Sequence, residues 1–401
     1  MPVDLLNQAV EHTSAKAIQI HADQCLAVRH RLSSCRACVE ACPAQAITRQ
    51  GNLLDVDRLL CLDCGACTVA CPTEALTMAG CDPEQLSDRV DETLSRADDI
   101  AIIACSSMVS KSGADRLKLV EVPCLGWVDE GVLVDAAAFG ACKIVLVDAG
   151  CDTCEFGGCE PSIDSCVAAA RSLLDACGSP VLVKRSGKFP SVARPDQILD
   201  DGSRGRLRRR FLGRAANGAA QTALSAFKIS PDKQKDEPAS RAATFKALRA
   251  TGDALPYVRG ARRERKLAAL ASLVDEAESL DGALFSVRDF AHVDIDTDAC
   301  IGCGMCQMFC PTGALKMDED GDSKRLVFSA FQCIGCDMCQ DVCFRKCVTV
   351  LPEVPVADVF SGQPRSFELN PEIGRQPNKA FGMGAGSVAH AVLGVSEGKK
   401  S

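Results

Sequence analysis

Residues 300–343 decide the fold of one part of the chain. They read CIGCGMCQMFCPTGAL, and CIGCDMCQDVC follows from Cys333 after a short spacer. Each half has the spacing C-x2-C-x2-C-x3-C, and the first half ends in Cys310–Pro311. Three thiolates on a tight loop, with a fourth one helical turn further on, suit the corners of an iron–sulfur cubane. Small residues such as Gly302 allow the sharp turns that bring the backbone close to inorganic sulfur.

Three other fates of these cysteines fit the pattern less well. Zinc takes two C-x2-C pairs and would leave the third and fourth cysteine of each run unused. Disulfides need an oxidising compartment and a geometry that C-x2-C-x2-C rarely permits. Inert burial is the ordinary fate of one cysteine rather than of eight in register. The spacing therefore predicts two [4Fe-4S] clusters in this segment.

The segment resembles the bacterial two-cluster ferredoxin family, in which the fourth cysteine of each run ligates the other cluster. The resemblance implies a module over residues 291–352 made of two β-α-β halves. It also implies two ligand sets, Cys300, Cys303, Cys306 with Cys343, and Cys333, Cys336, Cys339 with Cys310.

A second module with the same resemblance is predicted within residues 1–80. Its second half has the regular spacing, but its first half supplies only three cysteines at standard positions. Cys25 is the candidate for the missing ligand, with LAVRHRLSS inserted between it and Cys35. The resemblance implies the ligand sets Cys25, Cys35, Cys38 with Cys71, and Cys61, Cys64, Cys67 with Cys42. The two modules together predict four [4Fe-4S] clusters.

The insertion after Cys25 leaves the role of that cysteine open. A three-iron cluster would result if Cys25 were not a ligand. His21 and His30 lie nearby in the sequence and are candidate substitutes. Nitrogen ligation of cubanes is uncommon, so we expect both histidines to be surface side chains.

Residues 98–185 predict a central α/β domain. The apolar runs IAIIAC, LVEVPC, KIVLVDAGC and PVLV alternate with helical patterns. Short, fully apolar strands that alternate with helices are typical of a parallel sheet covered on both faces. The predicted fold class is therefore α/β plus α+β, with small ferredoxin-like β-α-β modules at both ends of a central parallel-sheet domain.

Cysteines follow three of these strands, at the edge where such sheets form their sites. Cys105, Cys124 and Cys151 each come just after a strand, and Cys154 and Cys159 follow on a Gly-rich loop. The stretch PCLGWVDEGVLVDAAAFGACKIVLVDAGCDTC resembles the delta subunit of methyl-viologen-reducing hydrogenase. That family passes electrons between a hydrogenase or formate dehydrogenase and a heterodisulfide-reductase-type flavoprotein, and it carries a [2Fe-2S] centre.

This second resemblance implies metal ligation by Cys105, Cys124, Cys151 and one of Cys154 or Cys159. The chain departs from the family at ACSS, where two cysteines are usual. A [2Fe-2S] cluster, a redox dithiol and inert thiols therefore all stay open. Three further cysteines follow apolar spacing and are expected in the core, namely Cys142, Cys166 and Cys177.

Residues 186–290 are predicted as a basic linker with amphipathic helices, and residues 353–401 as a tail. The run RLRRRFLGRAANGAAQTALSAF at residues 206–227 indicates a basic amphipathic helix or a solvated charged face. RRERKLAALASLVDEAESL predicts a helix that is basic at its start and acidic near its end. Because this order opposes the helix dipole, we expect external partners for both ends.

The composition of the chain and the motifs that it lacks exclude several classes of function. The chain has 26 cysteines in 401 residues and no evident signal peptide, which favours the reducing cytoplasm. It has no apolar stretch of membrane-spanning length, and its net charge of −8 and single tryptophan argue against nucleic-acid binding. It also lacks a P-loop, a dinucleotide fingerprint and a catalytic constellation.

We therefore expect an iron–sulfur electron-transfer subunit of a cytoplasmic oxidoreductase in anaerobic metabolism. The expected partners are redox subunits such as a flavoprotein, a hydrogenase, a formate dehydrogenase or a heterodisulfide-reductase-like protein. The alternative is a disulfide or thiol reductase that acts through the strand-end cysteines. A zinc-stabilised scaffold is a third interpretation.

Overall fold

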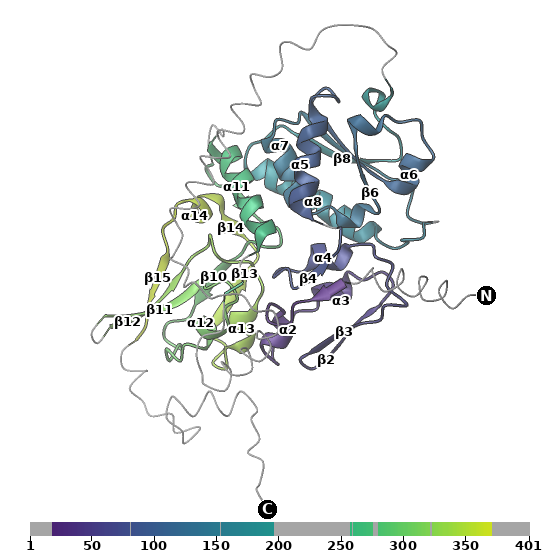
Figure 1. The fold of residues 1–401 in the computed structure, drawn as a ribbon. Helices are drawn as coiled ribbons and strands as arrows, with labels where there is room; N and C mark the ends of the chain where they lie inside the picture. Colours follow the sequence, from purple (N-terminus) through teal and green to yellow (C-terminus); the bar gives the residue numbers. More distant parts are fainter. Residues whose placement is uncertain are drawn as a thin grey trace, which may run out of the picture.

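The computed structural model describes residues 18–80, 82–152, 154–195, 257–258, 260–275, 280–320 and 323–370. It has a mixed α/β architecture, with a four-stranded parallel sheet in the middle of the sequence and small antiparallel sheets in the segments before and after it (Figure 1). The predicted fold class is confirmed at this level. The helix predicted at residues 206–227 and the tail after residue 370 lie outside the described residues.

The N-terminal module contains two antiparallel strand pairs. β1 (Ile18–Ile20) pairs with β4 (Leu76–Met78), and β2 (Ile47–Gln50) pairs with β3 (Leu53–Val56). The first and last strands of the module are therefore neighbours. Its short helices are α2 (Leu26–Arg29), α3 (Ala37–Glu40) and α4 (Ala66–Ala70).

The C-terminal module has the same kind of strand pairing with two additions. β10 (His292–Ile295) pairs with β13 (Val348–Leu351), again joining the first and last strands of the predicted module. A three-stranded sheet has the order β11 (Leu315–Asp320), β12 (Ser323–Phe328), β15 (Arg365–Glu368). The remaining elements are the pair β9 (Leu284–Phe285) and β14 (Val354–Pro355), and the helices α12 (Met305–Phe309), α13 (Met338–Val342) and α14 (Val356–Phe360).

The predicted domain boundaries fall inside this module. β14, α14 and β15 belong to the segment predicted as a tail, and β9 belongs to the predicted linker. Val354, Val356 and Val359 are fully buried, so this part of the tail contributes to a core. Elements of two to five residues are too short to show periodicity in the sequence, which is why the pattern did not reveal them.

The central domain is built on the parallel sheet. Its strand order is β6 (Val120–Val122), β5 (Ile100–Cys105), β7 (Lys143–Val147), β8 (Leu182–Ser186). One face is covered by α5 (Pro83–Leu94), α7 (Glu130–Ala138) and α8 (Glu160–Ala176). The other face is covered by α6 (Ser106–Ser110) and by the turn η3 (Ser191–Ala193). Burial on both faces explains the apolar sequences of β5 and β7, as predicted.

Two details differ from the core predicted for this domain. Ala193 is fully buried against the sheet although it lies in the predicted linker. Cys166 and Cys177 are buried as expected, but Cys142 is exposed in the turn before β7. A turn that enters a buried strand can carry an apolar residue on its solvent side, so the prediction for Cys142 was wrong.

The helix predicted from RRERKLAALASLVDEAESL is present as α11 (Ala261–Asp275), beside α7 (Figure 1). External partners were predicted for its basic start, but the partners are internal. Arg262 donates to the backbone carbonyls of Thr68 (2.7 Å) and Cys71 (2.5 Å) in the N-terminal module. Lys266 Nζ lies 2.7 Å from carboxylate oxygens of both Glu130 and Asp289. These contacts satisfy the positive charges within the chain, and the acidic residues after 275 lie outside the described part of the helix.

Candidate iron–sulfur cluster sites

The sixteen predicted cluster ligands fall into four groups of four thiols. Site 1 consists of Cys25, Cys35, Cys38 and Cys71, and site 2 of Cys42, Cys61, Cys64 and Cys67. Site 3 consists of Cys310, Cys333, Cys336 and Cys339, and site 4 of Cys300, Cys303, Cys306 and Cys343. All sixteen are free cysteines.

One backbone hydrogen bond recurs at all four sites. Each site takes three cysteines from one loop and a fourth cysteine from the other half of the module. The acceptor of the bond is the carbonyl four residues after that fourth cysteine, and the donor is the amide four residues before the first cysteine of the loop. The bonds are His21 N to Ala75 O (2.8 Å) at site 1, Asp57 N to Ala46 O (2.8 Å) at site 2, Ser329 N to Ala314 O (2.8 Å) at site 3, and Asp296 N to Cys347 O (2.9 Å) at site 4. The bond joins the two halves of each module in the register that the crossed ligand assignment requires.

Cys25 occupies the same backbone position as the regular first cysteines. Its amide donates to the carbonyl of His21 (3.2 Å), just as Cys61 donates to Asp57 (3.1 Å). The same bond joins Cys300 to Asp296 (3.0 Å) and Cys333 to Ser329 (3.2 Å). The insertion that follows Cys25 therefore leaves the start of the site 1 loop in the regular geometry.

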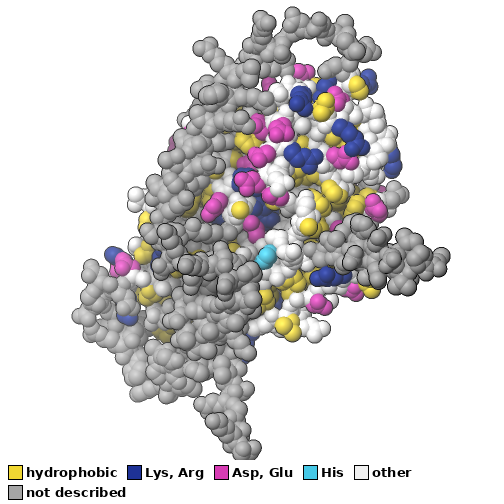
Figure 2. Space-filling view, viewed as in Figure 1, with side chains coloured by type: hydrophobic (Ala, Val, Ile, Leu, Met, Phe, Trp, Pro, Cys, Tyr) yellow, Lys and Arg dark blue, Asp and Glu magenta, His cyan; other side chains and the backbone are white. Residues whose placement is uncertain are grey.

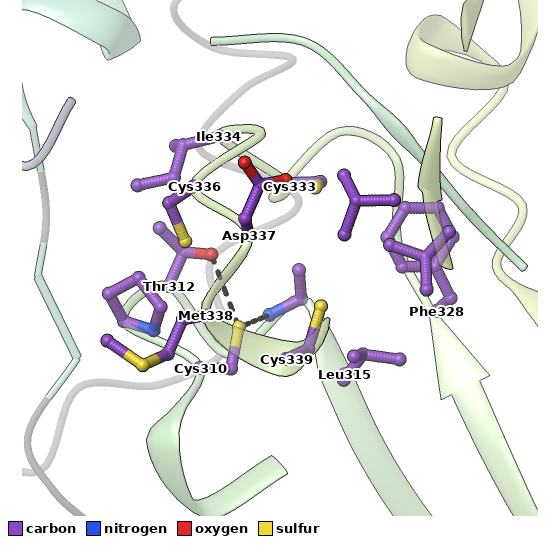
Figure 3. Close-up of a pocket in the computed structure, with 14 residues that line it drawn as sticks. Cys310, Thr312, Leu315, Phe328, Cys333, Ile334, Cys336, Asp337, Met338 and Cys339 are labelled. Carbon is purple, nitrogen blue, oxygen red and sulfur yellow. Dashed lines mark hydrogen bonds between the residues drawn. The ribbon is translucent and has the colours of Figure 1, made fainter. Parts of the chain in front are cut away.

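Two of the sites line cavities. The four thiols of site 3 surround one cavity, and Figure 3 shows their side chains gathered around it from two separate segments. Cys310 Sγ accepts a hydrogen bond from the amide of Ala314 (3.2 Å) and contacts the Thr312 hydroxyl (3.7 Å). The four thiols of site 2 line a second cavity. Four convergent thiols with few other polar groups fit a cubane, which needs one thiolate for each iron.

The thiols of sites 1 and 4 also lie close together, because, in addition to burial, the charges of neighbouring thiolates raise the pKa values of Cys38 and Cys306. Burial and the nearby thiolates of Cys71, Cys35 and Cys25 raise the pKa of Cys38 to about 12. At site 4, burial and the thiolates of the other three members raise the pKa of Cys306 to about 12. Neighbouring thiolates repel one another, and bound iron would offset that repulsion because metal-bound thiols are deprotonated.

Left-handed backbone at the second turn of three loops starts the helices that carry the third cysteine. Gly65 (φ 80°), Gly304 (φ 72°) and Asp337 (φ 59°) precede α4, α12 and α13. Glycine adopts this conformation without strain, whereas Asp337 does so as one of the few tolerated residue types. Arg36 holds the equivalent position in site 1 with φ −133°, so this loop follows a different course after Cys35.

The cysteines predicted as a metal site in the central domain are distributed differently. The thiol of Cys159 lies near those of Cys124 and of Cys64 in site 2, and hydrogen bonding from Cys159 lowers the pKa of Cys124 and lowers that of Cys64 to about 7. Cys151 Sγ lies 3.7 Å from Arg185 Nη2.

The two remaining cysteines of this predicted set lie at the ends of secondary structure. Cys105 is the last residue of β5 and is buried, and Cys154 lies in the turn after Cys151 and is half-buried. The structure thus brings Cys124 and Cys159 together beside site 2. The sequence pattern did not reveal this contact with the N-terminal module, because it depends on how two domains pack.

Trp127 reinforces the contact between the central domain and site 2. Its Nε1 donates to the carbonyl of Asp63 (3.0 Å), and its ring packs against Gly65. A side chain at Gly65 would collide with that ring, so this glycine is needed for close packing as well as for its left-handed φ. Trp127 therefore lies directly on the loop that carries Cys61, Cys64 and Cys67.

The insertion after Cys25 lies at the interface between the two modules. Leu26 packs in one apolar cluster with residues of α12 and α13, and Cys35 of site 1 and Cys336 of site 3 pack against the same cluster. Figure 1 shows α2 next to α13. His30 stacks edge-on against Phe309 with ring centroids 4.5 Å apart. The inserted residues thus join site 1 to site 3.

Neither histidine predicted on the surface is freely exposed. His30 is buried, and its Nδ1 accepts a hydrogen bond from the amide of Leu32 (3.1 Å). His21 is half-buried, and its Nε2 lies 2.9 Å from the hydroxyl of Thr77. The surface prediction for His30 was wrong because the insertion is enclosed by the other module, which no local pattern indicates.

Arg29 is the most deeply buried charge in the insertion. Its side chain is fully buried, and burial lowers its pKa to about 10 although the thiolates of Cys310 and Cys336 oppose the shift. The guanidinium therefore stays charged at neutral pH, close to site 3. The apolar residues Leu26 and Val28 around it are the one signal in the sequence that this segment is covered.

Comparison with known proteins identifies both modules. Residues 292–344 match a family described as a 4Fe-4S dicluster domain, and residues 33–76 match another family with the same description. The chain contains two 4Fe-4S dicluster domains. They are ferredoxin-type electron-transfer domains, and together they imply about four [4Fe-4S] clusters. The N-terminal match begins after Cys25, and neither match includes the central domain.

A similar protein is a ferredoxin from Thermococcus litoralis. It is 54% identical over 35 residues, which cover 9% of this chain and 58% of the ferredoxin. The chain thus spans less than two thirds of the length of this relative. No solved structure gives a significant match. Within the described residues, no helix combines the length and the apolar character that a membrane span requires.

Proposed function

We propose that the chain is a multi-cluster electron-transfer subunit that relays electrons inside a larger cytoplasmic oxidoreductase. The observation that carries this proposal is the packing of Cys35 of site 1 and Cys336 of site 3 against one apolar cluster. A bound [4Fe-4S] cluster takes up and releases single electrons, and ligation by four cysteines leaves no iron open to a substrate. One apolar cluster that packs against ligands of both modules favours a continuous relay over two independent ferredoxins.

The contacts support an order along the relay. Cys124 and Cys159 of the central domain adjoin Cys64 of site 2. Sites 1 and 2 share the N-terminal module, site 1 adjoins site 3 through the insertion, and sites 3 and 4 share the C-terminal module. The proposed order is therefore the central domain, site 2, site 1, site 3 and site 4.

The two ends of this path favour different partners. At site 4, Cys303 is the one ligand of the sixteen that is exposed, which favours electron exchange with another protein there. At the other end, the resemblance of the central domain to the hydrogenase delta subunit favours a hydrogenase, a formate dehydrogenase or a heterodisulfide-reductase-type flavoprotein. Positive and negative side chains are intermingled on the face of the central domain shown in Figure 2, which suits a polar interface with a protein partner.

Iron content and partner identity test this function. Protein purified without oxygen should be brown and hold roughly 16 iron per chain, or about 18 if the central domain binds a [2Fe-2S] cluster. Purification of the tagged chain from its native host should bring oxidoreductase subunits with it. Stoichiometric zinc with little iron would contradict the cluster sites. A chain that holds its iron but elutes alone would contradict the role as a subunit.

Reduction of a disulfide by the chain itself is a second candidate function. It is favoured by the contact of Cys159 with both Cys124 and the site 2 ligand Cys64. A disulfide between Cys124 and Cys159 would be broken by two electrons from the relay and two protons, one of each for each sulfur, and the resulting dithiol would reduce a substrate disulfide by exchange. Turnover of oxidised lipoamide by the isolated chain, abolished in Cys159→Ala, would favour this function. Reduction and reoxidation without turnover favours the relay.

A further inference from the structure

Cys347 occupies a position that alanine occupies in the other three repeats. Each run ends with a cysteine, and the residue four positions later is Ala46, Ala75, Ala314 or Cys347. The residue just before it has left-handed backbone in all four repeats, at Gln45 (φ 51°), Glu74 (φ 53°), Gly313 (φ 72°) and Lys346 (φ 54°). The left-handed turn before this position is therefore shared by the four repeats.

In the first three repeats the residue at this position is alanine, and its backbone amide is the group that contacts the sulfur of the ligand. The amides of Ala46, Ala75 and Ala314 each donate to the sulfur of the preceding cysteine at 3.2 Å. In the fourth repeat a second thiol enters this space. Cys347 Sγ lies 3.5 Å from Cys343 Sγ, and both residues are buried.

Cys347 also adjoins the opposite half of site 4. It is buried in the same core cluster as Cys300 and Cys343. The carbonyl of Cys347 accepts the amide of Asp296 (2.9 Å), which fixes the residue at the start of the Cys300 loop. Cys347 therefore belongs to site 4 by position, although the C-x2-C-x2-C-x3-C spacing does not include it.

We propose that site 4 is a five-thiol site in which Cys347 is a reserve ligand that replaces Cys343. This inference rests on the proposed function, since it assumes that site 4 holds iron. In the exchange, Cys347 Sγ forms a bond to the iron that Cys343 Sγ releases. The proton of the Cys347 thiol passes to Cys343 Sγ across their contact, so that charge and protons balance.

Two features of site 4 suit such an exchange. Cys303 is exposed, so this site is the most accessible of the four to oxidants that remove iron. Phe344 follows Cys343, whereas proline follows the last cysteine of the other three runs, at Pro43, Pro72 and Pro311. Because proline fixes φ, its absence leaves this segment freer to bring Cys347 to the iron.

Site 3 offers a matched control within the same module. Cys310 is its equivalent of Cys343, and Ala314 takes the place of Cys347. We expect Cys310→Ala to lose one iron per chain and to show a three-iron signal in electron paramagnetic resonance after oxidation. Cys343→Ala should keep its iron and show no such signal. The double variant Cys343→Ala/Cys347→Ala should behave like Cys310→Ala.

Introducing the fifth cysteine at site 3 provides a test that does not depend on the folding of the single variants. Adding Ala314→Cys to Cys310→Ala should restore the lost iron at site 3, and Cys347→Ala alone should retain full iron. If Cys343→Ala loses as much iron as Cys310→Ala, the reserve-ligand proposal is wrong. The relay would still be supported in that case, provided that the wild-type protein holds its iron. Wild-type protein without iron would overturn the proposed function itself, and the reserve ligand with it.

Discussion

Ser34 donates two hydrogen bonds to one carboxylate oxygen of Asp341, from its backbone amide at 2.7 Å and from its hydroxyl at 2.8 Å. The two residues are 307 positions apart and belong to different dicluster domains. Ser34 directly precedes Cys35 of site 1, and Asp341 lies on α13, between two of the predicted cluster ligands. A charged hydrogen bond of this kind holds the loops of two cluster sites against each other.

Removal of the charge of Arg29 should lower the reduction potential of one cluster. The guanidinium lies near Cys310 and Cys336, and a buried positive charge stabilises the reduced, more negative form of a cluster. For Arg29→Gln we expect a fall of several tens of mV, where about 59 mV is a tenfold change for one electron. A redox titration followed by electron paramagnetic resonance measures the shift.

Two variants control for this effect. Arg29→Lys keeps a positive charge and should recover most of the shift, while Arg31→Gln changes an exposed arginine of the same insertion and should leave the potential unchanged. Equal potentials in Arg29→Gln and Arg31→Gln would show that the charge of Arg29 does not act on site 3.

Replacement of Cys25 should damage a single cluster. Cys25 has the backbone bond to His21 that marks the first cysteine at each site, and its thiolate acts on the pKa of Cys38. Cys25→Ala should lose one iron per chain and show a three-iron signal after oxidation. Cys142→Ala is the matched control, because this thiol is exposed and lies outside the four sites. An unaltered spectrum for Cys25→Ala would mean that another group completes site 1.

Emission from Trp127 should report on site 2. The indole is hydrogen-bonded to Asp63 and packs on Gly65, both of which lie between ligands of that site. Iron–sulfur clusters absorb where indole emits, so the wild-type protein should be strongly quenched. Cys67→Ala should raise the emission more than Cys333→Ala, which disturbs the more distant site 3. A greater rise in Trp127 emission in Cys333→Ala would mean that the quenching does not come from the cluster at site 2.

Loss of Lys266 should destabilise the packing of α11. Its ammonium is fully buried between Glu130 and Asp289. Removal of one partner from a buried ion pair typically costs about 3–5 kcal/mol. Lys266→Ala should therefore lower the midpoint of urea unfolding, measured by circular dichroism without oxygen. Lys111→Ala, at an exposed position, should change the free energy of unfolding by less than about 0.5 kcal/mol.

The same variant should alter the response to acid. Burial alone would raise the pKa of Glu130, but Lys266 and Arg288 outweigh it and hold the pKa well below its usual range. The pKa of Asp289 is also lowered, because Lys266 outweighs burial. The native state therefore binds fewer protons than the unfolded state in acid, so this contribution to stability is complete above about pH 4.5 and is lost as the pH falls through the native pKa values. Lys266→Ala should lose less stability than wild type on acidification, and an equally steep loss would contradict the assignment.

Local spacing was sufficient to predict the chemistry of the two modules. The thiols of each loop lie within seven residues of one another at sites 2, 3 and 4, so their geometry follows from a turn and the helix after it. The apolar runs of the central domain likewise predicted its sheet, because β5 and β7 are buried on both faces at every position after the first. The run PVLV overlaps β8 only at Leu182 and Val183, and Val183 is the one buried residue of that strand.

Tertiary structure decided how these parts are connected. The contacts of Cys64 with Cys159, Arg29 with site 3, and Arg262 with Thr68 and Cys71 join segments from different domains. The charge order of α11 predicted external partners, yet its basic residues are satisfied by carbonyls and carboxylates of the same chain. A sequence pattern records which side chains need a partner, but the identity of that partner depends on the packing of surfaces that are distant along the chain.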